Sequence, residues 1–205
     1  MEEFNIVLAG VGGQGILLAG EVLGTAGMKE GLNVVAGEIH GLAQRGGSVV
    51  STIRIGDRVL APTILDGQAD VILGFEPLET LRSLKYASGK TCVIVNDEKI
   101  PPPELSSKNL PYPSISDITK KIHRFTKRVI VVEAASMAKK AGSSLTQNMV
   151  LVGALAATGK LPIKKESIIK ALGELIPKRH LEMNTKAFDL GYTYVEKLIQ
   201  HALNF

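Results

Sequence analysis

The sequence is poor in cysteine and in aromatic residues. Cys92 is the only cysteine among 205 residues, tryptophan is absent, and tyrosine and phenylalanine together number nine. A single cysteine excludes a disulfide framework, a zinc ribbon and an iron–sulfur cluster held by this chain alone. No apolar run approaches the ~18 residues of a membrane span, and the acidic start Met1–Phe4 lacks the basic region of a secretory signal. We therefore expect a cytoplasmic protein without membrane association.

Positive charge is concentrated in the second half of the chain. The formal net charge is +4, but residues 1–100 carry 8 Lys and Arg against 12 Asp and Glu, whereas residues 101–205 carry 16 against 8. Five cations gather between Lys120 and Arg128, with Asp117 as the only acid close to them. Such a cluster is usually a solvated surface, and otherwise it faces an acidic partner. Because no basic run is interleaved with aromatic residues, we do not expect nucleic-acid binding.

The first part of the chain has the pattern of a β-α-β unit. Apolar runs and helical spacing predict a strand, a helix and a second strand, at residues 4–10, 14–29 and 33–36. This order is typical of a parallel sheet. Gly20, Gly24 and Gly27 lie on one face of the predicted helix, which indicates that the helix packs very close to the sheet. The glycine-rich residues 37–47 are predicted to be irregular.

The remainder continues this alternation and then becomes helical. Further strands are predicted at residues 48–55, 58–61, 70–75, 91–96 and 128–133. The turn at Gly56 and Asp57 would return 58–61 as an antiparallel strand, so the sheet is expected to be mixed. Helices are expected near 78–86, 116–124 (capped by Ser116), 134–141, 146–158, 164–176 and 181–202. We predict one α/β domain over residues 1–205, a three-layer α/β/α Rossmann-like fold with a mostly parallel, mixed sheet and a helical C-terminal part.

A glycine-rich loop joins the first predicted strand to the first predicted helix. It has the spacing G-x-G-x-x-G, and its candidate binding residues are Gly10, Gly12, Gly13, Gln14 and Gly15. Glycines there permit a tight turn, and the N–H groups at the helix start attract a phosphate or a carboxylate. Glu38 lies where dinucleotide-binding proteins have an acid that contacts a ribose, so a free-standing NAD(P)- or FAD-binding protein is one hypothesis. The alternative is that the glycines only allow the helix to pack on the sheet.

A second glycine-rich segment precedes the strand predicted at residues 48–55. Its candidate residues for binding a ligand or partner are His40, Gln44, Arg45, Gly46 and Gly47. An arginine side chain forks onto carboxylates and phosphates, and glycines allow close approach to the backbone. The alternatives are that Arg45 pairs with Glu38 and fixes the loop, and that His40 is an ordinary polar loop residue. No catalytic or metal-binding set stands out, so we assign no catalytic residue and no metal ligand.

The two glycine loops together resemble the gamma-type subunit of the thiamine-diphosphate-dependent 2-oxoacid:ferredoxin oxidoreductases, over nearly the whole chain. The segment His40–Gly47 is most similar to the beta subunit of the indolepyruvate:ferredoxin oxidoreductases. Pyruvate and oxoglutarate branches usually have Tyr-Gly and an acid before Arg-Gly-Gly, where this chain has His40-Gly41 and Gln44. Other residues that are similar to the family are Asn96, the segment Asn148–Gly153, Asn184, Ala187, Phe188 and Gly191.

The resemblance implies a subunit of an enzyme that decarboxylates a 2-oxoacid, of the indolepyruvate or arylpyruvate type, to an acyl-coenzyme A. It places thiamine diphosphate, magnesium and 4Fe-4S clusters on a larger partner subunit, with coenzyme A as cosubstrate and ferredoxin as electron acceptor. With one cysteine and no Gly-Asp-Gly diphosphate motif, this chain is expected to bind none of these cofactors alone and to be inactive by itself. Its role is then to complete the complex and to bind an anion such as a coenzyme A phosphate. A pure interaction module without any ligand is the third hypothesis.

Overall fold

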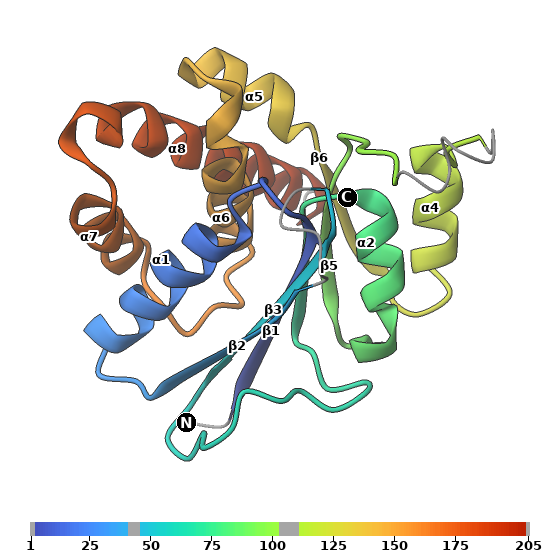
Figure 1. Ribbon diagram of the computed structural model, residues 1–205, viewed down its shortest axis with the longest axis horizontal. Helices are drawn as coiled ribbons and strands as arrows, with labels where there is room; N and C mark the ends of the chain where they lie inside the picture. Colours follow the sequence, from blue (N-terminus) through green and yellow to red (C-terminus); the bar gives the residue numbers. More distant parts are fainter. Residues whose placement is uncertain (1–2, 41–45, 103–110, 204–205) are drawn as a thin grey trace.

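The chain folds around a six-stranded sheet that lies between two layers of helices (Figure 1). We describe it from a computed structural model, which defines residues 3–40, 46–102 and 111–203. The strands lie side by side in the order β2-β3-β1-β4-β5-β6. They are β1 (Phe4–Val11), β2 (Val34–His40), β3 (Ser48–Ile55), β4 (Val71–Gly74), β5 (Cys92–Asn96) and β6 (Arg128–Val132).

The strand directions make the sheet mixed. β1, β4, β5 and β6 are parallel neighbours, whereas β3 is antiparallel to both β1 and β2. The prediction of a mostly parallel, mixed sheet is therefore confirmed. However, β3 is inserted between the two strands of the β1-α1-β2 unit, an arrangement that the sequence did not indicate.

The antiparallel strand predicted at residues 58–61 does not form, and that prediction is wrong. Side chains of β3 hold this segment as a loop. The Thr52 hydroxyl donates to the Pro62 carbonyl oxygen at 2.9 Å, and Arg54 Nη1 donates to the Ala61 carbonyl oxygen at 2.8 Å. Because Pro62 has no N–H to give to a ladder, side-chain bonds replace strand pairing here.

The second strand is longer than its composition suggests. β2 runs on to His40 although glycine-rich residues 37–47 were expected to be irregular. Gly37 pairs with Thr52 in the β2–β3 ladder, and a Cβ on Gly37 would lie 2.6 Å from Pro62 Cβ. The glycine thus allows the 56–70 loop to pack against a regular strand.

Successive residues of a strand point to opposite faces of the sheet, so the strands contribute to two apolar layers, one on each face. Ile6 and Leu8 pack with the helices on one face, and Val7 packs with those on the other. Cys92 is buried in the sheet, where it packs as a small hydrophobe, and burial raises the pKa of its thiol. On the face of Ile6 lie α1 (Ile16–Lys29), α5 (Ala134–Ala141), α6 (Gln147–Ala157), α7 (Lys165–Leu175) and α8 (Lys178–Leu203). On the face of Val7 lie α2 (Pro77–Arg82), η1 (Ser83–Tyr86) and α4 (Ile115–Ile122).

The predicted three-layer α/β/α fold with a helical C-terminal part is confirmed. The cap of α4 and the start of α8 differ from the prediction. Ser114, and not Ser116, caps α4, because its hydroxyl accepts the N–H of Asp117 at 3.1 Å. α8 begins at Lys178, directly after Pro177, three residues earlier than expected. Within the described residues, none of the helices combines the length and hydrophobicity needed to cross a membrane.

The glycine stripe of α1 lies against the sheet, as predicted. A Cβ on Gly20 would be 3.5 Å from Leu8 Cδ1, and a Cβ on Gly27 would be 2.9 Å from Val34 Cγ2. The helix therefore approaches the strands most closely at its C-terminal end. Its glycines disfavour the isolated helix, and the close packing they permit offsets that penalty.

Candidate functional site

A cavity of about 310 Å³ opens at the carboxyl ends of β1, β4 and β5. The helix after β1 lies on one face of the sheet and the helix after β4 lies on the other (Figure 1). This is a topological switch point, where open α/β sheets usually bind their ligands. The lining residues come from the first glycine loop, the ends of β4 and β5, η2 (Ser144–Thr146) and α6: Gly12, Gly13, Gln14, Phe75, Asn96, Glu98, Ile100, Ser144, Leu145, Gln147 and Leu151.

The two glycine loops of the sequence meet beside this cavity. The N–H of Gly12 donates to the Gly47 carbonyl oxygen at 2.9 Å, and the N–H of Gly46 donates to the Gly12 carbonyl oxygen at 3.4 Å. Gly13, Gly15 and Gly46 have φ angles of 102°, 71° and 75°, which favour glycine. The structure thus joins segments that are more than thirty residues apart in sequence into one surface.

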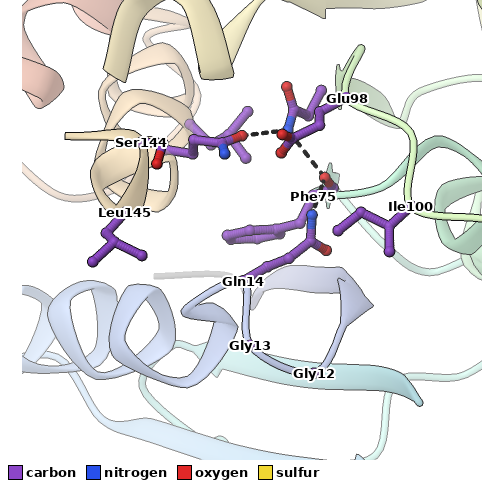
Figure 2. Close-up of a pocket in the computed structure, with 11 residues that line it drawn as sticks. Gly12, Gly13, Gln14, Phe75, Glu98, Ile100, Ser144 and Leu145 are labelled. Atoms are coloured by element: carbon purple, nitrogen blue, oxygen red, sulfur yellow. Dashed lines mark hydrogen bonds between the residues drawn. The ribbon is translucent and has the colours of Figure 1, made fainter. Parts of the chain in front are cut away.

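The Gln14 side chain connects the first glycine loop to the end of β4 (Figure 2). Its Oε1 accepts the N–H of Val11 at 2.8 Å, and its Nε2 donates to the Phe75 carbonyl oxygen at 2.9 Å. A Cβ on Gly10 would lie 2.6 Å from Gln14 Oε1, so glycine at that position leaves room for the amide. Gln14 therefore acts first as an internal brace of the switch point.

Asn96 extends the brace to the later helices. Its Nδ2 donates to the Phe75 carbonyl oxygen and to Gln147 Oε1, both at 3.1 Å, and its Oδ1 accepts the N–H of Ala134 at 3.2 Å. One buried amide thereby links the ends of β4 and β5 to the first residues of α5 and α6. The two Nδ2 bonds are among the dashed lines in Figure 2, where one of them ends on the labelled Phe75.

Asn148 lies in the first turn of α6, where its Oδ1 accepts the free N–H of Met149 at 3.0 Å, whereas Asn184 lies inside α8 and caps no helix start. Asn148 Nδ2 donates to the Gly15 carbonyl oxygen at 3.2 Å and so ties α6 to the first glycine loop. Asn184 Nδ2 donates to the His180 carbonyl oxygen at 2.8 Å within α8. A Cβ on Gly15 would lie 2.5 Å from Asn148 Nδ2, which explains why the loop has glycine there.

A buried carboxylate beside the site was not singled out in the sequence. Glu76 follows β4 and caps α2, since its Oε2 accepts the N–H groups of Leu78 at 2.7 Å and Glu79 at 3.0 Å. The Tyr112 hydroxyl donates to the same carboxylate, and burial together with that carboxylate raises the pKa of Tyr112. Glu76-Pro77 is a sequence signal for a helix start that could have identified this cap.

Charge in the cavity is acidic on the β5 side. Glu98 lines the cavity, and the neighbouring Asp97 has a raised pKa because of burial and then the negative charges of Glu133 and Glu98. Among the described lining residues there is no lysine or arginine. The side of the cavity formed by the first glycine loop has hydrogen-bond donors in place of carboxylates. The N–H groups of Gly13 and Gly15 donate to no acceptor within the described part of the chain. An anion would therefore lie against the loop and away from Glu98.

The second glycine loop is only partly defined. His40 is the last residue of β2, Gln44 and Arg45 lie outside the described residues, and Gly46 and Gly47 pair with the first loop. Glu38 lies on β2, and β3 separates β2 from β1. The strands β1 and β2 are therefore two strand spacings apart, about 10 Å in total. In the dinucleotide-binding order these strands are adjacent. Because β1 and β2 are not adjacent in this sheet, Glu38 does not lie where dinucleotide-binding proteins have the acid that contacts the ribose.

Sequence reasoning found the glycine loops but missed most of the opposite wall. Phe75, Glu98, Ile100, Leu145 and Gln147 were not predicted to line a site. The available signal was positional, because Phe75 and Glu98 directly follow predicted buried strands, and ligands bind at the carboxyl ends of parallel strands. Leu145 and Gln147 had no such signal, since they reach the cavity only through the packing of η2 and α6.

Comparisons with known proteins agree with this architecture. The family model described as pyruvate ferredoxin/flavodoxin oxidoreductase matches residues 5–194. Indolepyruvate oxidoreductase subunit IorB of Pyrococcus horikoshii is 40% identical over 200 residues, 97% of this chain and 99% of that protein. The subunit of the same name from Archaeoglobus fulgidus is 44% identical over 188 residues, 92% of this chain and 93% of that protein.

A solved structure gives the same result. The gamma subunit of a keto/oxoacid ferredoxin oxidoreductase from Geobacter sulfurreducens aligns with a TM-score of 0.68 and 26% identity, over 94% of this chain and 98% of that one. The resemblance inferred from the glycine loops is confirmed. The chain therefore belongs to the pyruvate ferredoxin/flavodoxin oxidoreductase family and is a gamma-type subunit of a 2-oxoacid:ferredoxin oxidoreductase.

Proposed function

We propose that this chain is the small subunit of an indolepyruvate- or arylpyruvate-type oxidoreductase that forms acyl-coenzyme A. The observation that carries the proposal is the 40–44% identity to indolepyruvate oxidoreductase subunits over more than nine tenths of the chain. A larger partner subunit would hold thiamine diphosphate, magnesium and 4Fe-4S clusters, and ferredoxin would accept the electrons. We also propose that residues 1–205 form a single gamma-type domain in a cytoplasmic complex, in line with the match over residues 5–194.

We propose that the joined glycine loops are the surface through which the chain meets its partner subunit or a coenzyme A phosphate. The residues involved would be Gly10, Gly12, Gly13, Gln14, Gly15, His40, Gln44, Arg45, Gly46 and Gly47. Backbone N–H groups of Gly13 and Gly15 suit an anion, and the exposed Leu17 and Leu145 beside them suit an apolar partner contact. Since Glu98 repels a phosphate and no described lining residue is cationic, Arg45 would supply the positive charge.

Reconstitution of the enzyme from its subunits tests the proposal that the partner subunit, and not this chain, holds the cofactors. The purified chain, given a 2-oxoacid, thiamine diphosphate, magnesium, coenzyme A and an electron acceptor, is expected to show no 2-oxoacid oxidation, because it lacks cysteines for a cluster. Addition of the partner subunit should restore turnover, with an arylpyruvate preferred over pyruvate. Turnover by the colourless chain alone would overturn the division, and a preference for pyruvate would overturn the substrate class.

Arg45 gives a sharper test of the loop surface. Arg45→Ala is expected to weaken either subunit assembly or the apparent affinity for coenzyme A by roughly tenfold to a hundredfold, the loss of a charge-assisted hydrogen bond of about 1.5–3 kcal/mol. Arg45→Lys should recover only part of this, because the planar fork is lost. Assembly is measured by analytical ultracentrifugation and affinity by the KM for coenzyme A. A lower melting temperature with assembly and KM unchanged would instead identify Arg45 as an internal brace.

A further inference from the structure

The basic cluster noticed in the sequence forms a continuous surface in the structure. It surrounds a shallow depression of about 520 Å³ at the end of α4 and in the loop that leads to β6, lined by Gly89, Lys120, His123, Arg124, Phe125, Thr126 and Lys127. We call this surface the basic patch and include Lys121, which follows Lys120 in sequence, and Arg128, which follows Lys127. Arg128 is the first residue of β6 and pairs with the first residue of β5. The patch thus lies at the opposite end of the sheet from the glycine loops.

Charge in the basic patch is largely uncompensated. Residues 115–128 contain five Lys and Arg and one Asp, a net charge of +4 that equals the net charge of the whole chain. The carboxylate of Asp117 lies 3.9 Å from Lys120 Nζ. Among the described residues, no other carboxylate pairs with a cation of the patch. The four remaining cations therefore project a positive field from one small area.

The loop that carries the patch is held in a defined shape. Thr126 is buried, its hydroxyl donates to the Thr91 carbonyl oxygen at 2.7 Å, and it accepts the N–H of Arg128 at 3.1 Å. Arg128 Nη1 donates to the Lys90 carbonyl oxygen at 3.0 Å. Phe125, between the cations, is 47% exposed. The patch therefore presents its cations around one aromatic ring on a loop whose backbone is held in place, which lowers the entropy lost by the loop on binding.

We propose that the basic patch is the docking surface for an acidic protein that binds reversibly to the assembled oxidoreductase. Permanent subunit interfaces are large and apolar, whereas this surface offers one exposed ring within a field of charge, which is typical of small transient contacts. A nucleic acid would need a longer cationic track with more aromatic residues. The proposal does not depend on the substrate or on the role of the glycine loops.

Binding of a fluorescein-labelled peptide of eight glutamates tests the proposal. The protein is the complex, purified through a tag on this chain, and binding is followed by fluorescence anisotropy. The charge-reversed triple variant Lys120→Glu, Arg124→Glu and Lys127→Glu is expected to bind the peptide about ten- to a hundredfold more weakly at low salt. The difference should shrink at high salt because exposed charges are screened.

A matched triple variant distinguishes the effect of the basic patch on peptide binding from the effect of the net charge of the chain. Lys139→Glu, Lys140→Glu and Lys197→Glu reverses the same number of exposed positive charges on α5 and α8 and should leave binding within about twofold. Equal weakening in both triple variants, or no binding to the wild-type complex, would overturn the proposal. So would tighter binding of an eight-nucleotide single-stranded DNA, or loss of the partner subunit from the patch variant. If that variant misfolds, the neutral pair Arg124→Gln and Lys127→Gln should still weaken binding.

Discussion

Replacing Gly191 by alanine is expected to lower the free energy of unfolding by about 3 kcal/mol or more, at the upper end of what overpacking costs. Gly191 lies on α8 where that helix crosses the buried helix α6. A Cβ on Gly191 would lie 1.9 Å from the Val150 carbonyl oxygen, and a Cβ on Gly153 would lie 2.0 Å from the Phe188 carbonyl oxygen. The two backbones touch at both points, so neither position can take a methyl group unless the helices separate.

Urea denaturation of the isolated chain measures the effect of Gly191→Ala. Gly173→Ala is the matched control, because Gly173 is an exposed glycine in α7 whose added Cβ meets nothing within 4 Å. That control should gain about 0.5–1 kcal/mol from better helix propensity. If Gly191→Ala unfolds at the wild-type urea concentration, the close crossing of α6 and α8 is contradicted.

Asn96→Leu is expected to destabilise the chain by about 2–4 kcal/mol, because the substitution keeps the size of the side chain and removes two buried hydrogen bonds and one partly buried hydrogen bond. Ala134 N–H and Gln147 Oε1 lose their partner, and the Phe75 carbonyl oxygen keeps only Gln14. The cavity floor would then be held by one amide in place of two. We therefore expect a weaker link between the sheet and the α5–α6 segment.

The charged variant Asn96→Asp tests the same site with a carboxylate. An aspartate still accepts the N–H of Ala134, but its buried negative charge would face the Phe75 carbonyl oxygen and Gln147 Oε1, so a loss at least as large as that of Asn96→Leu is expected. Asn33→Leu serves as the control, since Asn33 makes one exposed bond to the Asp57 carbonyl oxygen. Thermal and urea denaturation of all three variants provide the measurement. Equal stability of Asn96→Leu and Asn33→Leu would contradict the bracing role.

The candidate site could be predicted only in part. The loop Gly10–Gly15 was identifiable because its signal is local: an apolar strand, closely spaced glycines, then helical spacing. Gln14 was predicted as a candidate binding residue, and in the structure its amide is hydrogen-bonded within the chain to Val11 and Phe75. Phe75 lies more than sixty residues away in sequence. No local pattern can indicate which distant carbonyl oxygen an amide will meet.

The sequence by itself determined the class of fold, the positions of most helices and strands, the glycine loops and the family. These follow from short-range rules, because alternation and helical spacing define buried faces, and glycine defines where the backbone can turn or be approached. Only the tertiary structure decided that β3 lies antiparallel between β1 and β2, that Gly12 pairs with Gly46 and Gly47, and that Gly153 and Gly191 bring α6 onto α8. Each of these joins residues remote in sequence, and their pairing is set by the packing free energy of the whole core, which no window of neighbouring residues contains.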